Sequence, residues 1–372
     1  MAAFKDNIGR ATVERLADAF RGAHPEFPRD AFVERATAGL DALELKARVD
    51  HVAAALVDAL PGDFSVAAPI VSRAIGPTDY GMWEVWPVTM WVALAGIDDP
   101  DRALPLLAEL TSHASAEFAI RPFIDAHLDR VSAELSQWVE HPDEHVRRLV
   151  SEGTRPLLPW APRLAVAANE PGWAIRWLDA LRDDPSSFVR RSVANHLNDL
   201  TKLDRDLAVA TAQRWMARPS TEVEAVVRHG LRSLIKRGDT DALAVIGIDH
   251  TAPVEVVELR VHTPQVRLGD ALELDVVVRN AGDAPATAVV DYAVHLQRAN
   301  GRTSRKVFKL RSVRIDPGAT VELRKRHVIA PVTVRRYYPG THVVDVQCNG
   351  VVQASGAFEL VVDDQTAPGA RP

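Results

Sequence analysis

The segment HPDEHVRRLVSE, residues 141–152, decides the fold of the first two-thirds of the chain because related segments follow it. They are DPSSFVRRSVAN at residues 184–195 and RPSTEVEAVVRH at residues 218–229. Each copy reads Pro, three residues, Val, three more residues and a second Val, and the prolines are 43 and 34 residues apart. Such steps are typical of HEAT-like helical hairpins, which stack into a curved solenoid because one hairpin cannot bury its apolar stripe alone.

The sequence around these copies has the same helical character. From Lys5 to about Gly247, apolar residues recur at helical spacing and prolines stand at the junctions between segments. We therefore predict a HEAT-like repeat domain over residues 1–248.

A different pattern begins at about Asp249. Residues 254–261, 271–280, 288–296 and 342–350 alternate at period two and are rich in β-branched side chains, with Asn-Gly and Pro-Gly turns in the same region. About seven strands over roughly 110 residues predict an immunoglobulin-like β-sandwich. The expected organisation is an α-solenoid over 1–248, a sandwich over 249–363 and a disordered tail over 364–372.

Composition excludes several classes of protein. The chain has 372 residues, 47% of them hydrophobic and 25% charged, as in ordinary globular proteins. No run of about 18 apolar residues and no apolar export segment is present, so we expect a cytoplasmic protein without a membrane partner. A single cysteine, Cys348, excludes an internal disulfide and a cysteine-rich metal site. Phosphate-binding loops, zinc-protease helices and nucleophile elbows are absent from the sequence, so we expect neither cofactor nor metal.

Charge is distributed unevenly along the chain. The net charge is −6, yet residues 251–372 carry 16 Lys and Arg against 13 Asp and Glu, whereas residues 1–250 carry 28 against 37. Between Arg302 and Arg336 there are 11 basic residues and only two acids, Asp316 and Glu322. Such a run is either a solvated sheet face or a surface for an acidic partner.

Two sets of polar residues in the repeats are candidates for function. The position two residues after the second Val holds Glu152, Asn195 and His229 in the three copies, beside Arg147, Arg148, Arg190 and Arg191. Three acids, Glu117, Glu152 and Asp199, each come from a different repeat. Taken singly, each arginine can equally bridge neighbouring helices, and each acid can equally be a cap or a solvated residue. The stripe Trp83, Trp86 and Trp91 is interpreted as core.

Five segments carry a resemblance to a known family: KDNIGRATVERL (5–16), DYGMWEVWPVTMWVAL (79–94), EFAIRPF (117–123), VRRLVSEGTRPLLPW (146–160) and VRRSVANHLNDLTK (189–202). They resemble the AlkC branch of the bacterial DNA alkylation repair glycosylases, which are HEAT-repeat proteins related to AlkD. The resemblance runs over about residues 5–245, and some members of the branch carry a C-terminal immunoglobulin-like domain.

The resemblance implies a monofunctional N-glycosylase that removes cationic alkylated bases, chiefly 3-methyladenine and also 3-methylcytosine, from duplex DNA. Glu117, Glu152 and Asp199 match the family's acidic active-site positions, and Trp160 is expected to form an aromatic wall. We expect Glu152 to position the attacking water and the other two acids to support it as anions. The resemblance also implies that the lesion stays largely stacked in the DNA.

DNA binding is assigned to polar and basic side chains, and the arginines among them also offset the acids. In the repeats we expect these contacts from Arg147, Arg148, Arg155, Arg190, Arg191, Asn195 and Arg228. In the sandwich we expect them from Arg305 and Lys306, with this domain closing on the duplex opposite the solenoid. A monomer is expected, which associates with the bacterial nucleoid through DNA.

Two other functions remain open at this level. One is a non-catalytic HEAT scaffold for DNA or protein, and the other is an adaptor that binds an acidic partner through residues 302–336. The scaffold predicts that Glu117, Glu152 and Asp199 are dispersed and face solvent, and the adaptor needs no active site. An enzyme requires the three acids to converge beside Trp160.

Overall fold

The computed structural model describes residues 4–76, 80–298, 301–332 and 336–362. The contacts divide the chain into two compact units, Met1–Gly230 and Leu231–Pro372, which are described separately below. The predicted fold class is confirmed, because helices fill the first unit and eight strands form the sandwich of the second within the described residues. The predicted tail, 364–372, lies outside the described residues.

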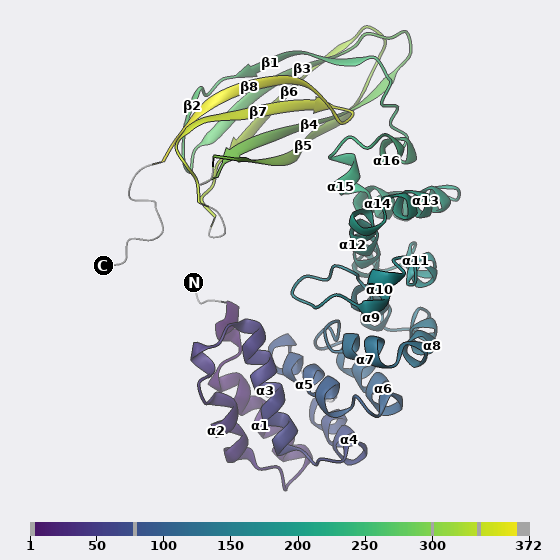
Figure 1. The fold of residues 1–372 in the computed structure, drawn as a ribbon, viewed down its shortest axis with the longest axis vertical. Coiled ribbons are helices and arrows are strands. Elements are labelled where there is room, and N and C mark those ends of the chain that lie inside the picture. Colours follow the sequence, from purple (N-terminus) through teal and green to yellow (C-terminus); the bar gives the residue numbers. More distant parts are fainter. Residues whose placement is uncertain (1–3, 77–79, 299–300, 333–335, 363–372) are drawn as a thin grey trace. The chain divides into compact units, whose positions relative to one another are not determined.

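The first unit is built of helices that stack one pair after another (Figure 1). In chain order they are η1 Phe4–Asn7, α1 Arg10–Ala23, α2 Arg29–Thr37, η2 Leu40–Ala42, α3 Leu45–Ala59, α4 Phe64–Ile75, α5 Met82–Ala95, α6 Pro100–Leu110, α7 Ile120–Ala126, α8 Leu128–Trp138, α9 Glu144–Gly153, α10 Ala165–Asn169, α11 Ile175–Leu181, α12 Ser187–Leu203, α13 Arg205–Met216 and α14 Thr221–Gly230.

The three related sequence segments become α9, α12 and α14, and α12 packs against both of the others. A proline precedes an N-capping side chain in each copy. The oxygens of Asp143, Ser186 and Ser220 accept a hydrogen bond from the backbone N–H two or three residues further on. Both Val residues of each copy are buried. The repeat register read from the sequence therefore sets where these helices begin and which side they bury.

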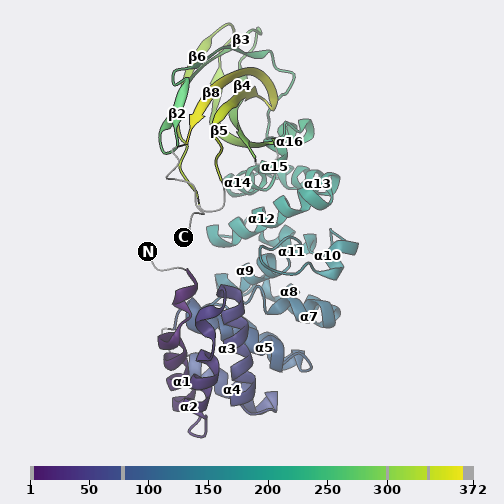
Figure 2. The ribbon, with the colours of Figure 1, turned by 60° about the vertical axis from the view of Figure 1, so that its left-hand side comes forward.

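The second unit begins with two short helices, α15 Arg232–Ile235 and α16 Thr240–Val245. Its strands are β1 Val254–Val261, β2 Gln265–Arg267, β3 Ala271–Asn280, β4 Ala286–Gln297, β5 Thr303–Ile315, β6 Thr320–Val328, β7 Gly340–Cys348 and β8 Val351–Val361. They form a three-stranded sheet of order β1-β3-β6 and a five-stranded sheet of order β2-β8-β7-β4-β5. The two sheets pack face to face over one apolar core (Figure 2).

The fourth predicted strand, 342–350, ends two residues early because a turn intervenes. Asn349 and Gly350 have φ of 47° and 82°, as a type I′ hairpin turn requires. A Cβ on Gly350 would stand 2.0 Å from the Cα of Gly238, so only glycine fits there. This turn packs α15 and α16 onto the sandwich, and Gln347 Nε2 also donates to the Lys236 carbonyl. The contacts therefore place residues 231–248 in the same unit as the sandwich, so the units divide between residues 230 and 231. Helical periodicity alone placed the domain boundary between residues 248 and 249.

The basic run lies mainly on β5 and β6. These are edge strands of the two different sheets, and they contact each other. The exposed cations there come from both strands and are Arg305, Lys306, Lys309, Arg311, Arg314, Arg324 and Arg326. One side of the sandwich is thus positively charged.

Among the described helices, none alone has the length and apolar character needed to cross a bilayer, whereas α3 and α4 pass that test together as a pair bent by 119°.

Candidate active site

A pocket of about 270 Å³ opens in the first unit, between α5, the segment that precedes α7, α9 and the segment that follows α9. Aromatic rings dominate its walls and come from Phe4, Trp83, Trp86, Phe118 and Trp160. Its polar side chains are Ser115, Glu117, Glu152 and Arg155. Apolar pockets with a few convergent polar groups are the usual form of a small-molecule or reaction site.

Two arginines join the three predicted acids into one cluster. Arg148 Nη1 lies 3.1 Å from Glu117 Oε2, and its Nη2 lies 3.7 Å from Glu152 Oε2. Arg155 Nη1 donates to Glu152 Oε1 at 2.7 Å, while its Nε donates to Asp199 Oδ2 at 2.9 Å. The acids therefore converge, as an enzyme requires and contrary to the dispersed arrangement that the scaffold hypothesis predicts.

Glu152 is held at both carboxylate oxygens. Besides the bond from Arg155 to Oε1, Ser192 Oγ donates to Oε2 at 2.6 Å, and Ser151 Oγ donates to Ser192 Oγ at 2.7 Å. Burial raises the pKa of Glu152, but Arg148, Arg155 and the Ser192 hydroxyl outweigh it, so the pKa is lowered overall. Glu152 is therefore a fixed anion at neutral pH.

Glu117 has one oxygen in use and one available. Ser115 Oγ and Arg148 Nη1 both donate to Oε2, at 2.7 and 3.1 Å. Among the described residues, no hydrogen bond reaches Oε1. Because Glu117 lines the pocket, it has a free lone-pair site where a substrate or a water would lie.

Asp199 lies one layer behind the pocket. It is buried and is absent from the pocket wall, and Arg155 stands between it and Glu152. Lys202 Nζ is 3.7 Å from the other Asp199 oxygen. The imidazole of His196 is also buried here, and burial lowers its pKa to about 4, so it is neutral. Asp199 therefore holds Arg155 rather than facing the pocket.

The cluster places carboxylates beside the pocket and balances them with cations. Three carboxylates face the two guanidinium groups of Arg148 and Arg155, and the exposed ammonium of Lys202 lies 3.7 Å from Asp199. The carboxylates at the pocket wall are those of Glu117 and Glu152, and anions held there suit a site that must stabilise a developing cation.

The aromatic wall is larger than the sequence indicated. Trp160 lines the pocket as predicted and is 71% exposed. Trp91 is buried as core, but Trp83 and Trp86 also line the pocket, so the core interpretation was incomplete for them. Trp86 stacks on Phe118 with ring centroids 5.5 Å apart. Helical spacing shows which residues share a face of a helix, but it does not show whether that face packs in the core or lines a cavity.

The predicted DNA-binding arginines divide into engaged and exposed groups. Arg147 pairs with Asp184 and donates to the carbonyls of residues 141 and 142, which uses four of its five N–H groups. Arg190 donates to the carbonyls of residues 184 and 185 in the same manner. The Arg147–Asp184 pair joins two copies of the repeat, and Arg190 ties α12 to the residues that precede it in its own copy, so we infer a structural role for both rather than the phosphate contact we predicted. Arg191 and Arg228 are exposed.

The other predicted DNA-binding residues also have partners within the protein. Arg148 and Arg155 are committed to the acids rather than displayed to a phosphate. Asn195 lies 3.3 Å from the ring of His229, so two of the three equivalent repeat positions contact each other. Arg305 donates to Gln347 Oε1 in the second unit, and the Lys306 ammonium lies 5.2 Å from the Phe308 ring centroid.

Three positioning side chains were missed by the sequence analysis: Ser115, Ser192 and Phe188. The Arg148 guanidinium lies 4.5 Å above the Phe188 ring. Ser192 had a detectable signal, because it occupies the repeat position that Leu149 occupies in the preceding copy. A small polar residue at a core position indicates a specific partner.

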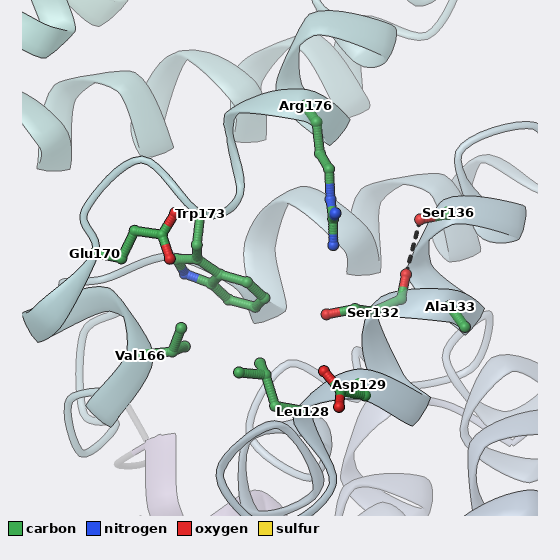
Figure 3. A pocket seen from close by; sticks show the side chains of 9 residues that line it. All are labelled: Leu128, Asp129, Ser132, Ala133, Ser136, Val166, Glu170, Trp173 and Arg176. Atoms are coloured by element: carbon green, nitrogen blue, oxygen red, sulfur yellow. Dashed lines mark hydrogen bonds between the residues drawn. The ribbon is translucent and has the colours of Figure 1, made fainter.

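A second cavity of about 410 Å³ lies between α8, α10 and α11 (Figure 3). Trp173 and Arg176 border it on one side, Asp129 on another, and Ser136 Oγ donates to the Ser132 carbonyl along its wall. It contains none of the predicted site residues and mixes both signs of charge. The aromatic pocket, which holds Glu117 and Glu152, is therefore the candidate site. Among the described residues, no group of three or more His, Cys, Asp and Glu side chains could hold a metal ion.

Comparison with known proteins extends over both units. Residues 255–362 match the family model described as the C-terminal Ig-like domain of the uncharacterised protein YhaZ. The uncharacterised protein YhaZ of Bacillus subtilis strain 168 is 30% identical over 97% of this chain and 100% of its own length. Alkylpurine DNA glycosylase AlkC of Pseudomonas fluorescens, bound to DNA containing an abasic site analog, is 35% identical. It covers 97% of this chain and 100% of that chain, with a TM-score of 0.91.

The helical repeats, the carboxylate cluster and the appended sandwich together define the class of helical-repeat proteins related to DNA repair glycosylases. This chain belongs to the AlkC family.

Proposed function

We propose that this protein is a DNA repair glycosylase that hydrolyses the N-glycosidic bond of cationic alkylated bases in duplex DNA. The observation that carries the proposal is the convergence of three carboxylates from three repeats on one aromatic pocket. The similarity to Pseudomonas fluorescens AlkC, an alkylpurine DNA glycosylase, supports it. The preferred substrates would be 3-methyladenine and 3-methylcytosine.

The chemistry needs an anion more than an acid. A base alkylated at these positions carries a positive charge, so it departs with the bonding electron pair as a neutral molecule and without prior protonation. Positive charge then develops on the deoxyribose, where the carboxylates of Glu117 and Glu152 at the pocket wall would stabilise it. Aromatic faces such as that of Trp160 are attractive to the same cation.

We assign the water to Glu117 rather than to Glu152, which the sequence favoured. Glu152 is held at both oxygens, whereas Glu117 Oε1 has no hydrogen bond among the described residues. In this assignment water attacks the anomeric carbon and gives its proton to Glu117. Glu152 supplies fixed negative charge, and Asp199 positions Arg155.

DNA would be bound in part by the basic side of the sandwich. Lys306→Gln removes an exposed cation without removing a described ion pair. We expect log Kd to depend less steeply on log salt concentration, with the slope smaller by about 1, because one fewer counterion is released. Titrating a labelled duplex at four salt concentrations measures it. Arg176→Gln, in the second cavity of the repeat unit, is the matched control and should leave the slope unchanged; equal slopes for wild type and Lys306→Gln would remove Lys306 from the interface.

The proposed function is tested by incubating the full chain with methylated duplex DNA in the presence of EDTA. The expected product is free 3-methyladenine, together with abasic sites that remain uncleaved until alkali is added. Release that requires a divalent metal would contradict the metal-free mechanism. Binding of duplex DNA without release of any alkylated base would instead favour the non-catalytic scaffold.

A further inference from the structure

We propose that Arg121, which lies outside the pocket wall, is the positioning residue that fixes the segment 154–163 and thereby holds Trp160 across the pocket. The role rests on the proposed glycosylase function, since its consequence is a faster reaction. Its structural part can be measured without any activity.

Arg121 reaches the segment from α7 and holds its two ends. Its Nη1 donates to the carbonyls of Gly153 and Arg155, both at 2.9 Å, and its Nη2 donates to the Pro162 carbonyl at 2.6 Å. The first two carbonyls mark the end of α9 and the third lies beyond Trp160. One planar guanidinium thus closes the segment into a loop.

The same short helix supplies a second anchor one turn further on. Asp125 Oδ1 accepts a hydrogen bond from the backbone N–H of Ala165, where α10 begins. Because Arg121 and Asp125 are four residues apart, they lie on one side of α7. The Ile120 side chain also approaches Gly153 so closely that a Cβ there would lie 2.7 Å from it. Helix α7 is therefore fitted to this segment.

The segment needs such an anchor because the Trp160 side chain has little support of its own. Trp160 is 71% exposed, and within the described residues its indole takes part in no hydrogen bond and no ring stacking. Its φ of +65° is also unfavourable for a side chain with a Cβ. Prolines at 156, 159 and 162 restrict the backbone further. The conformation that displays Trp160 therefore depends on contacts elsewhere in the fold.

Burial of a guanidinium at this place is itself a sign of a specific role. Arg121 is only 2% exposed, and burial lowers its pKa to about 10, so it stays charged at neutral pH. Among the described residues its Nε has no hydrogen-bond partner. A charge is buried at such a cost only where its remaining donors are well used, and here three of the four remaining N–H groups donate to the carbonyls of Gly153, Arg155 and Pro162.

The first test is a double-mutant cycle on base release under single-turnover conditions, with Arg121→Met, Trp160→Ala and the double variant. We expect Arg121→Met to slow base release at least 10-fold in the wild-type background and less than threefold in the Trp160→Ala background. The reason is that Arg121 acts on the rate through the position of Trp160. Equal factors in both backgrounds would overturn the proposal. Added methylguanidinium should restore part of the rate of Arg121→Ala but not of Trp160→Ala.

The second test measures how firmly the segment 154–163 is held, by its rate of proteolysis, and needs no activity. Trypsin can cut after Arg163, which is exposed, whereas Pro156 protects the bond after Arg155. We expect cleavage after Arg163 to be at least 10-fold faster in Arg121→Met than in the wild type. Arg48→Met is the matched control, because Arg48 is 3% exposed and donates to carbonyls of residues 5, 8, 41 and 43 in the first helices.

The control separates local loosening from general loss of stability. If Arg48→Met lowers Tm as much as Arg121→Met but leaves cleavage after Arg163 slow, the effect of Arg121 is local, as proposed. If both variants are cleaved there equally fast, Arg121 is an ordinary fold residue and the proposal is wrong. A wild type without base release would refute the proposed function while leaving this second test intact.

Discussion

Glu117→Gln is expected to slow release of 3-methyladenine from duplex DNA by at least about 100-fold, within the usual range for loss of a positioned general base. The substitution keeps the shape of the side chain and an acceptor for Ser115 and Arg148. It removes the charged oxygen that faces the pocket and would accept the proton of the attacking water. Single-turnover release, with enzyme in excess over methylated DNA, measures this step without product dissociation.

Glu152→Gln is the informative partner of that variant. It should also be slow, since it removes fixed negative charge, but it should in addition lower Tm because Arg155 loses a buried partner. Glu117→Gln should leave Tm within a few degrees of the wild type, because Glu117 is less deeply buried than Glu152. A Glu117→Gln rate within threefold of the wild type would return the water-positioning role to Glu152.

Arg155→Met is expected to lower the free energy of unfolding by about 3–5 kcal/mol, the typical cost of leaving a buried ion pair without one partner. It strips a hydrogen-bonded cation from two buried carboxylates at once, those of Glu152 and Asp199. The pKa of Glu152 should then rise in the folded protein, because burial still raises it and one of the cations that lower it is gone. The folded variant therefore binds more protons than the folded wild type, so its loss of stability relative to the wild type should shrink as the pH falls. Urea unfolding at pH 7 and pH 5 measures both effects.

Two further variants test whether the loss of stability comes from the buried, unpaired carboxylates. Lys202→Met removes an exposed cation 3.7 Å from the same Asp199 and should cost less than about 1 kcal/mol, as exposed ion pairs do. The triple variant Arg155→Met, Glu152→Gln, Asp199→Asn should recover part of the loss, because no unpaired charge is left buried. A loss of under 1 kcal/mol for Arg155→Met would show that water already reaches the cluster.

The repeat register was predictable because it depends on local chemistry. Pro142, Pro185 and Pro219 stand before N-capping side chains, and the Val residues that follow are buried in all three copies. The sandwich was predictable for a similar reason, since period-two alternation and the Asn349–Gly350 turn are local signals. The chain cannot adopt another register without exposing these apolar side chains.

The sequence by itself thus determined the fold class and the position of the repeats, because helix caps, turn residues and apolar periods act over a few residues. The three acids were proposed from the family resemblance of the segments that contain them. Only the tertiary structure decided how those acids are used. Glu152 is immobilised by Ser192 from the next repeat, Asp199 is kept behind Arg155, and Glu117 retains a free oxygen. Each of these facts depends on contacts between residues 31 to 44 positions apart in the chain. Spacing along one helix carries no information about such contacts, since they form only when whole repeats pack against one another.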